Sequence, residues 1–598
     1  MNVFAKSKNR FACLLATALL AASTLAFDTA QAREPGTLLS HRESLLPAAS
    51  AEGNFLAAYI ASSARDTTAA AVFFRRLFDI DPSNADITER AFIAFLADGD
   101  MEGAFLAAER IVNADPNNGL AHLALGVRDL HQGRFAAARA RLEQGGRGQA
   151  ADLTATLLRA WAFAGSKDPK QAMATVDRLD GEPSFDIFRH YHGGLIAHFV
   201  GRPNDAERRL KAAYEQQPTA LSIVDAYARL LARRGKTEEA LAVYEAFSEV
   251  VPRHPTVVSQ VELIRTGETV ARAVSTVEEG AAEVLYALGS AGNSQGDELP
   301  AIIYLRLALH LAPKHQMALI TLADIYERMQ QYEQAIEVYE AIPADSAVRD
   351  SADIQIGVAL ERLDRKEEAS AHLEELMQRR PDDIEVVVAL ANILRVRQQF
   401  AEAAEVYSKA IDLIDEPDRS HWTLFYFRGA SYERSKQWEK AEADLKTALE
   451  LVPENSPIGE AQILNYLGYS WVDMGINIDE AFKLLQRAVE LSPRDGMIID
   501  SLGWAYFRLG RYEDAVRELE RAVELMASDP VINDHLGDAY WKVGRRLEAT
   551  FQWRHALASN PEPEDREKIE RKLIEGLDGE KPPTAVHRLP FEQTREGG

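Results

Sequence analysis

The stretch GMIIDSLGWAYFRLGRYEDAVRELERAVELMASD, residues 496–529, decides the fold of this chain. Its apolar residues recur at helical spacing in two runs, which are separated by the turn Gly510-Arg511. Gly503 in the first run and Ala515 in the second are small, so the two helices can approach each other closely. The stretch therefore predicts a hairpin of two helices.

The same hairpin recurs along the chain. Alanines occupy the position of Ala515 at intervals close to 34 residues, at Ala301, Ala335, Ala369, Ala403, Ala441, Ala481 and Ala549. Weaker marks extend the pattern toward the amino terminus, at Ala70, Ala104, Ala138, Ala206 and Ala240. This spacing predicts about fourteen hairpins in an all-α solenoid, which offers a long concave surface in place of an enclosed pocket.

These positions resemble the tetratricopeptide-repeat (TPR) family over roughly residues 51–561. The resemblance implies a right-handed superhelical solenoid, as one body or as two segments. The runs LNYLGYSWVDMGINIDEA (464–481) and INDHLGDAYWKVGR (532–545) further resemble large exported proteobacterial TPR proteins. Their relatives include an outer-membrane lipoprotein that acts as an adaptor of a periplasmic carboxyl-terminal processing protease. This second resemblance implies an address and a mode of action, and no active-site residue.

The first 32 residues have the pattern of a signal peptide. Basic residues precede the apolar run 11–27, and Ala30-Gln31-Ala32 is suited to cleavage. We therefore expect export to the periplasm, with at most peripheral association with the outer membrane; the alternative is an uncleaved anchor helix. Cys13, the single cysteine, lies at the start of the apolar run, so lipidation next to the mature chain is not expected.

Composition and periodicity divide the rest of the chain. We expect an irregular lead-in at 33–50, an N-terminal repeat block at 51–255, a divergent helical connector at 256–281, a C-terminal repeat block at 282–562, a capping helix at 563–576 and a disordered tail at 577–598. The connector is a candidate hinge, although a degenerate repeat pair explains it equally well. Glycines and Asp297 predict an exposed loop at 289–299.

The charge and the motifs argue against two classes of function. A formal net charge of −25 does not suit a nucleic-acid-binding surface, which needs clustered Lys and Arg. The chain contains no GxSxG, HExxH, GxxxxGK[ST], GxGxxG or CxxC motif. We therefore expect no enzymatic activity, no cofactor and no metal site, and we expect the partners to be other proteins.

The concave face is the predicted partner-binding site. In hairpins of this kind, residues of the first helix that are displaced from the packing positions line the groove. They are Asn465, Tyr469, Asp500, Trp504, Asp534, Asp538 and Trp541. Carboxylates beside large aromatics would suit a segment that carries Lys or Arg beside apolar side chains. Packing between neighbouring repeats is the alternative role for Trp504 and Trp541.

Two functions remain open from the sequence. The first is a periplasmic scaffold or adaptor of the cell envelope that binds partner segments and recruits clients to a protease. The second is an accessory scaffold in polysaccharide or cell-wall synthesis and export. Both are non-enzymatic, and the identity of the partner separates them.

Overall fold

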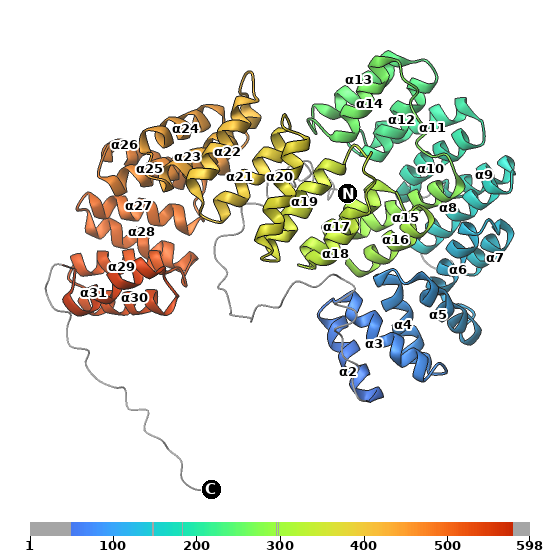
Figure 1. The fold of residues 1–598 in the computed structure, drawn as a ribbon, viewed down its shortest axis with the longest axis horizontal. Helices are drawn as coiled ribbons and strands as arrows, with labels where there is room; N and C mark the ends of the chain where they lie inside the picture. The colour runs from blue at the N-terminus through green and yellow to red at the C-terminus, as the bar shows by residue number, and fades with distance from the viewer. Residues whose placement is uncertain (1–49, 146–148, 182, 295, 297, 578–598) are drawn as a thin grey trace, which may run out of the picture. The chain divides into compact units, whose positions relative to one another are not determined.

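The computed structural model describes residues 50–145, 149–181, 183–294, 296 and 298–577. Within these ranges the chain forms thirty α-helices and no strand, which confirms the predicted all-α solenoid (Figure 1). The expected signal peptide, the lead-in before Ser50 and the tail from residue 578 lie outside the described residues. The described helices fall into two compact units, and the boundary in the chain lies between Arg379 and Arg380.

The first unit contains nineteen of the described helices. They are α2 (Ala51–Ser63), α3 (Thr67–Ile80), α4 (Ala85–Asp98), α5 (Met101–Ala114), α6 (Gly119–His131), α7 (Phe135–Gly145), α8 (Gln149–Gly165), α9 (Pro169–Val176), α10 (Asp186–Phe199), α11 (Pro203–Gln216), α12 (Leu221–Arg233), α13 (Thr237–Ser248), α14 (Pro255–Thr266), α15 (Val277–Ser294), α16 (Glu298–Leu311), α17 (Gln316–Arg328), α18 (Tyr332–Glu340), α19 (Arg349–Arg362) and α20 (Lys366–Arg379).

The second unit contains the remaining eleven. They are α21 (Ile384–Val396), α22 (Phe400–Asp412), α23 (Trp422–Arg434), α24 (Trp438–Leu451), α25 (Pro457–Met474), α26 (Ile478–Leu491), α27 (Gly496–Arg508), α28 (Tyr512–Leu525), α29 (Pro530–Lys542), α30 (Arg546–Ala558) and α31 (Pro563–Glu575). No helix among the described residues is both long enough and apolar enough to cross a bilayer.

Consecutive helices pair into hairpins, and we call the first helix of each pair A and the second B. The recurring alanines all lie on B helices and are buried, including Ala301 on α16 and Ala515 on α28. Opposite them, the A helices carry glycines that permit close approach. A Cβ atom at Gly503 would lie 2.7 Å from Leu519 Cγ, and one at Gly537 would lie 2.5 Å from Trp553 Cδ1. The small residues that define the repeat therefore pack the two helices of each hairpin together.

The expected connector at 256–281 is an A helix without its B partner. α14 ends at Thr266, and no helix forms from Gly267 to Thr276 before α15 begins. The loop expected at 289–299 is wrong over residues 289–294, which continue α15. The reason is packing, because a Cβ atom at Gly289 would lie only 2.9 Å from Leu305 Cγ on α16. Gly289 is a close-approach residue and not a turn former.

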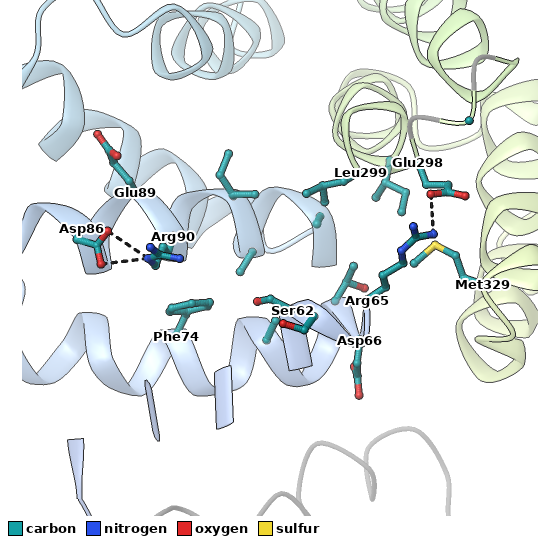
Figure 2. Close-up of a pocket in the computed structure, with 18 residues that line it drawn as sticks. Ser62, Arg65, Asp66, Phe74, Asp86, Glu89, Arg90, Glu298, Leu299 and Met329 are labelled. Carbon is teal, nitrogen blue, oxygen red and sulfur yellow. Dashed lines mark hydrogen bonds and ion pairs between the residues drawn. The ribbon is translucent and has the colours of Figure 1, made fainter. Parts of the chain in front are cut away.

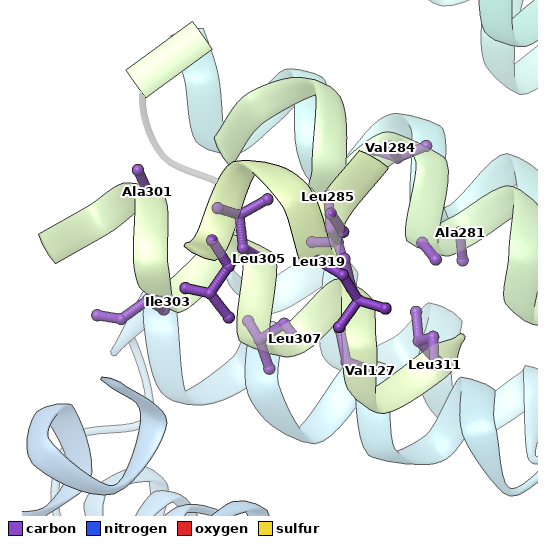
Figure 3. Packing of buried hydrophobic residues seen from close by; sticks show 14 of the residues in the cluster. Val127, Ala281, Val284, Leu285, Ala301, Ile303, Leu305, Leu307, Leu311 and Leu319 are labelled. Atoms are coloured by element: carbon purple, nitrogen blue, oxygen red, sulfur yellow. The ribbon is translucent and has the colours of Figure 1, made fainter. Parts of the chain in front are cut away.

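The hairpin α15–α16 packs against the A helices of the N-terminal repeats. α15 contacts α6, α8 and α10, and α16 contacts α4 and α6. Figure 3 shows Val127 of α6 in the same buried cluster as Leu307 and Leu311 of α16. Tyr191 on α10 also donates a hydrogen bond of 2.7 Å to Glu283 on α15. The expected break at 256–281 therefore does not separate two compact bodies, because the helices after it fill the concave face of the helices before it.

Candidate protein-binding groove

Three consecutive A helices of the second unit carry the predicted site. Asn465 and Tyr469 lie on α25, Asp500 and Trp504 on α27, and the remaining three on α29. α27 contacts both α25 and α29, so the structure brings these residues together along one row of helices. We call this row the α25–α29 groove. Asn465, Tyr469, Trp504 and Asp534 are partly exposed, whereas Asp500, Asp538 and Trp541 are buried.

Trp504 lies at the centre of a stack of aromatic rings. Its ring is nearly parallel to Phe507, at 4.7 Å between centroids, and to His535 of the next A helix, at 4.1 Å. His535 is fixed in turn by Asp500, whose two carboxylate oxygens both lie 3.0 Å from its Nδ1. Burial lowers the pKa of His535, but Asp500, Asp534 and Asp538 together raise it above its usual value, so the imidazolium form is favoured. Trp504 thus joins two repeats while part of its ring remains exposed.

The acidic end of the groove already holds a cation of the chain itself. Lys572 on α31 donates to Asp534 at 2.8 and 2.9 Å and to Asp538 at 2.8 Å. Asp538 also accepts a hydrogen bond of 2.9 Å from Trp553 Nε1. Burial raises the pKa of Asp538 to about 6, although Lys572 acts in the opposite direction. Asp534 and Asp538 therefore serve as the docking site of the capping helix.

Trp541 differs from the expectation that it faces a partner. Only 3% of it is exposed, and its ring lies 5.3 Å from that of Trp553 in the core of the last hairpin. The guanidinium of Arg546 covers it, 5.1 Å from the ring centroid. Of the two roles that the sequence left open for Trp541, the structure places it in packing between helices, because α30 supplies a large aromatic residue opposite it.

Two polar atoms in the groove lack a hydrogen-bond partner among the described residues. They are Oδ1 of Asn465 and Nε1 of Trp504, and both are buried although each residue is partly exposed. A buried polar group without a partner costs on the order of 1–3 kcal/mol. Both atoms are enclosed by the chain itself, so this cost belongs to the packing around the groove.

Sequence reasoning missed His535 and Lys572. His535 follows directly after Asp534, at a position that the groove rule does not select. Lys572 lies in the last turn of the expected capping helix, where a cation is explained by the helix dipole alone. The usable signal was the charge: Lys572 is one of two lysines on the helix that directly follows the hairpin carrying Asp534 and Asp538. Among the described residues, no cluster of side chains is suited to a metal ion.

Comparison with known families agrees with this geometry. Tetratricopeptide-repeat models match residues 194–250, 318–342, 354–416 and 388–457, and a further TPR-repeat model matches residues 503–544. These matches fall on A–B hairpins of both units. Over these segments the chain is similar to the tetratricopeptide-repeat family. Proteins of this family generally serve as scaffolds for interactions between proteins and are generally not catalytic.

Individual relatives match over short segments. A TPR repeat-containing protein of Pseudomonas aeruginosa is 29% identical over 152 residues, which cover 25% of this chain and 24% of the relative. The BBSome complex member BBS4 of Bos taurus is 31% identical over 115 residues, which cover 19% of this chain and 20% of the relative. Among solved structures, the APC/C heterotetramer Cut9–Hcn1 aligns over 90% of this chain and 99% of that chain, at 14% identity and a TM-score of 0.36.

Proposed function

We propose that this chain is a non-enzymatic scaffold of the cell envelope that binds segments of other proteins in the α25–α29 groove. The observation that carries the proposal is the contrast between the two concave faces. In the first unit, the A helices α4, α6, α8 and α10 are covered by α15 and α16. In the α25–α29 groove, Asn465, Tyr469 and Trp504 remain partly exposed.

The chemistry of the groove specifies the partner segment. Two partly exposed aromatic side chains, Tyr469 and Trp504, supply contact area for apolar residues. Lys572 is an internal example of the cation that the acidic end accepts, since it binds Asp534 and Asp538 together. The partner therefore carries Lys or Arg beside large apolar residues, and its cation competes with Lys572 for Asp534.

We also propose a location, the periplasm, and a specific role, the recruitment of clients to a protease. The basic, apolar and small-residue pattern of residues 1–32 supports export to the periplasm. The resemblance of residues 464–481 and 532–545 to exported adaptors supports recruitment of clients to a processing protease. Accessory work in polysaccharide or cell-wall synthesis is the other outcome of the same test.

Site-specific crosslinking in the native host tests the proposal. A photo-reactive phenylalanine replaces Tyr469 in the full chain, and the matched control carries it at Glu513, an exposed residue of α28. We expect one set of envelope proteins to be captured from position 469 and not from 513, and Trp504→Ala to reduce that capture. A protease captured with its clients supports the adaptor role, whereas a synthase and a porin would assign the alternative. Equal capture from both positions would contradict the proposal that partner segments bind in the α25–α29 groove.

A further inference from the structure

The first unit contains a cavity of about 680 Å³ beside the hairpin α15–α16, which we call the internal hairpin. It lies between α2, α3 and α4 on one side and the start of α16 with Met329 on the other (Figure 2). Its floor is apolar and includes Phe74, Ala94 and Ile302. All of its lining residues belong to the first unit. The cavity is thus separate from the α25–α29 groove.

The position of the cavity follows from where the internal hairpin lies. α15 and α16 pack along α4, α6, α8 and α10, and the cavity opens where α2 faces the start of α16. On α2, Leu56, Tyr59 and Ile60 are 59%, 55% and 58% exposed. Their spacing places them on one helical face that continues to Ser63 in the cavity wall. An exposed apolar stripe therefore leads into the cavity.

The chain itself indicates what kind of element this face accepts. At the neighbouring position, α16 presents buried Ile302 together with Arg306 to α4. The Arg306 side chain lies against the carboxyl end of α4, since a Cβ atom at Gly99 would be 3.3 Å from its Cδ. The A-helix face of α4 is thus already occupied by a helix that combines apolar residues with arginine.

Four carboxylates line the cavity together with its apolar residues. Two of its four carboxylates are paired, Asp86 with Arg90 at 3.0 Å and Glu298 with Arg65 at 2.7 Å. Asp66 caps α3 by accepting from the Ala69 N–H. Glu89 is exposed and forms no ion pair with any described residue. One unpaired carboxylate therefore stands at the rim of an apolar cavity.

We propose that this cavity and the exposed face of α2 form a second docking site, for an amphipathic helical segment of a partner protein. The apolar side chains of that segment lie over Phe74 and Ala94, and a Lys or Arg pairs with Glu89. The site is independent of the α25–α29 groove. A chain with both sites holds two different protein segments at once, so it works as a two-site adaptor.

A designed peptide tests the site on the full chain. The probe is a fluorescein-labelled helical peptide of 14 residues, with Leu at i, i+3, i+4 and i+7 and Lys on the flank. We expect Glu89→Lys to weaken its binding by at least about fivefold, since attraction becomes repulsion. The control Glu102→Lys makes the same charge change at an exposed residue of α5, and this variant should bind the probe like the parent chain. A peptide with Glu in place of Lys should bind worse than the probe.

Crosslinking locates the bound probe independently of affinity. In a Cys13→Ser background, Ser62→Cys carries a photo-crosslinker at the cavity wall, and Ser83→Cys carries it in the turn between α3 and α4. We expect an adduct from position 62 that unlabelled probe suppresses, and none from position 83. The proposal is overturned if the probe does not bind, if both positions react alike, or if Trp504→Ala removes binding while Glu89→Lys leaves it unchanged.

Discussion

The indole of Trp161 on α8 fills the space that a side chain at position 280 of α15 would need. A Cβ atom at Gly280 would lie 2.2 Å from Trp161 Cζ2, and Trp161 is fully buried. Residues that are far apart in the chain are thus fitted to each other across the concave face of the first unit. The glycine is required by this contact and not by its backbone conformation, because it lies inside a helix.

Replacing this glycine should therefore loosen the internal hairpin. We expect Gly280→Val to lower the free energy of unfolding of the first unit by about 1–3 kcal/mol, because Trp161 cannot move without disturbing α8. Denaturant unfolding measures the loss, and hydrogen exchange should show reduced protection in both α8 and α15. Ala136→Val, at an exposed position of α7, is the control and should cost only a few tenths of a kcal/mol. Unchanged protection in α8 would contradict the contact.

The last hairpin offers the same test between neighbouring helices. Gly537→Leu should overpack the seam against Trp553 and destabilise the second unit by about 1–3 kcal/mol. Loss of protection should begin in α29 to α31 and spread inward, because each hairpin is stabilised by its neighbours. Val531→Leu adds one methylene to an exposed residue of the same helix and serves as the control. Equal destabilisation by both changes would argue against the close approach at Gly537.

Lys572 should determine whether the capping helix stays docked. Lys572→Met keeps an unbranched side chain, shorter by one heavy atom, but leaves Asp534 and buried Asp538 without a cation, so we expect a loss of roughly 1–3 kcal/mol. Hydrogen exchange of α31 is the measurement. Lys568→Met is the matched control, since exposed Lys568 pairs with partly exposed Asp565 in the same helix. If α31 remains equally protected in both variants, the Lys572 cluster does not hold it.

Stability of the second unit should fall as the pH rises. Asp500 raises the pKa of His535 against the effect of burial, with Asp534 and Asp538 acting in the same direction. Because the folded-state pKa lies above the unfolded value, the stabilisation is complete below pH ~6.5 and is lost as pH rises through the folded value. Burial raises the pKa of Asp538 to about 6, so folding favours its protonated form and stability falls as this carboxyl ionises between pH ~4 and about 6.

The variant Asp500→Asn isolates the histidine in this pH dependence. Without the carboxylate, His535 is no longer stabilised in its charged form, and the decline of stability above pH ~6.5 should become smaller. Denaturant unfolding across a pH series measures it, with Asp495→Asn as a control that removes a carboxylate from the N-cap of the same helix. An unchanged slope in Asp500→Asn would exclude His535 as its source.

Export predicts a defined mature terminus. If residues 1–32 are removed as a signal peptide, the protein from the periplasmic fraction should begin at Arg33. N-terminal sequencing after fractionation measures this. Retention of Met1 in a cytoplasmic fraction would contradict the proposed location.

The hairpins could be predicted from sequence because their packing is local. Gly503 lies against Leu519, and Gly537 lies against Trp553, each within one repeat. Because every repeat needs the same contact, its residues recur at a spacing close to 34. The same holds for buried alanines such as Ala515 and Ala549. A periodic pattern therefore predicted the repeat and both helices of each hairpin.

Contacts between distant repeats could not be predicted this way. The sequence around Gly280 does not indicate that α15 packs against α8. It also does not indicate that Glu283 accepts a hydrogen bond from Tyr191. In the groove, the pattern selected Asp534 and Asp538 but could not show that Lys572 already pairs with them. Position along an A helix predicts which way a side chain faces. It does not predict which other part of the chain packs against that face.

The covering of α4, α6, α8 and α10 by α15 and α16 also sets the order in which the first unit can be completed. A solenoid normally forms by adding each repeat to the last, with contacts close in sequence. Here the apolar face of the early repeats stays open until residues 277–311 have been synthesised. At about 5–20 residues per second this interval lasts on the order of ten seconds. During that time the growing chain presents an apolar surface that the completed first unit covers.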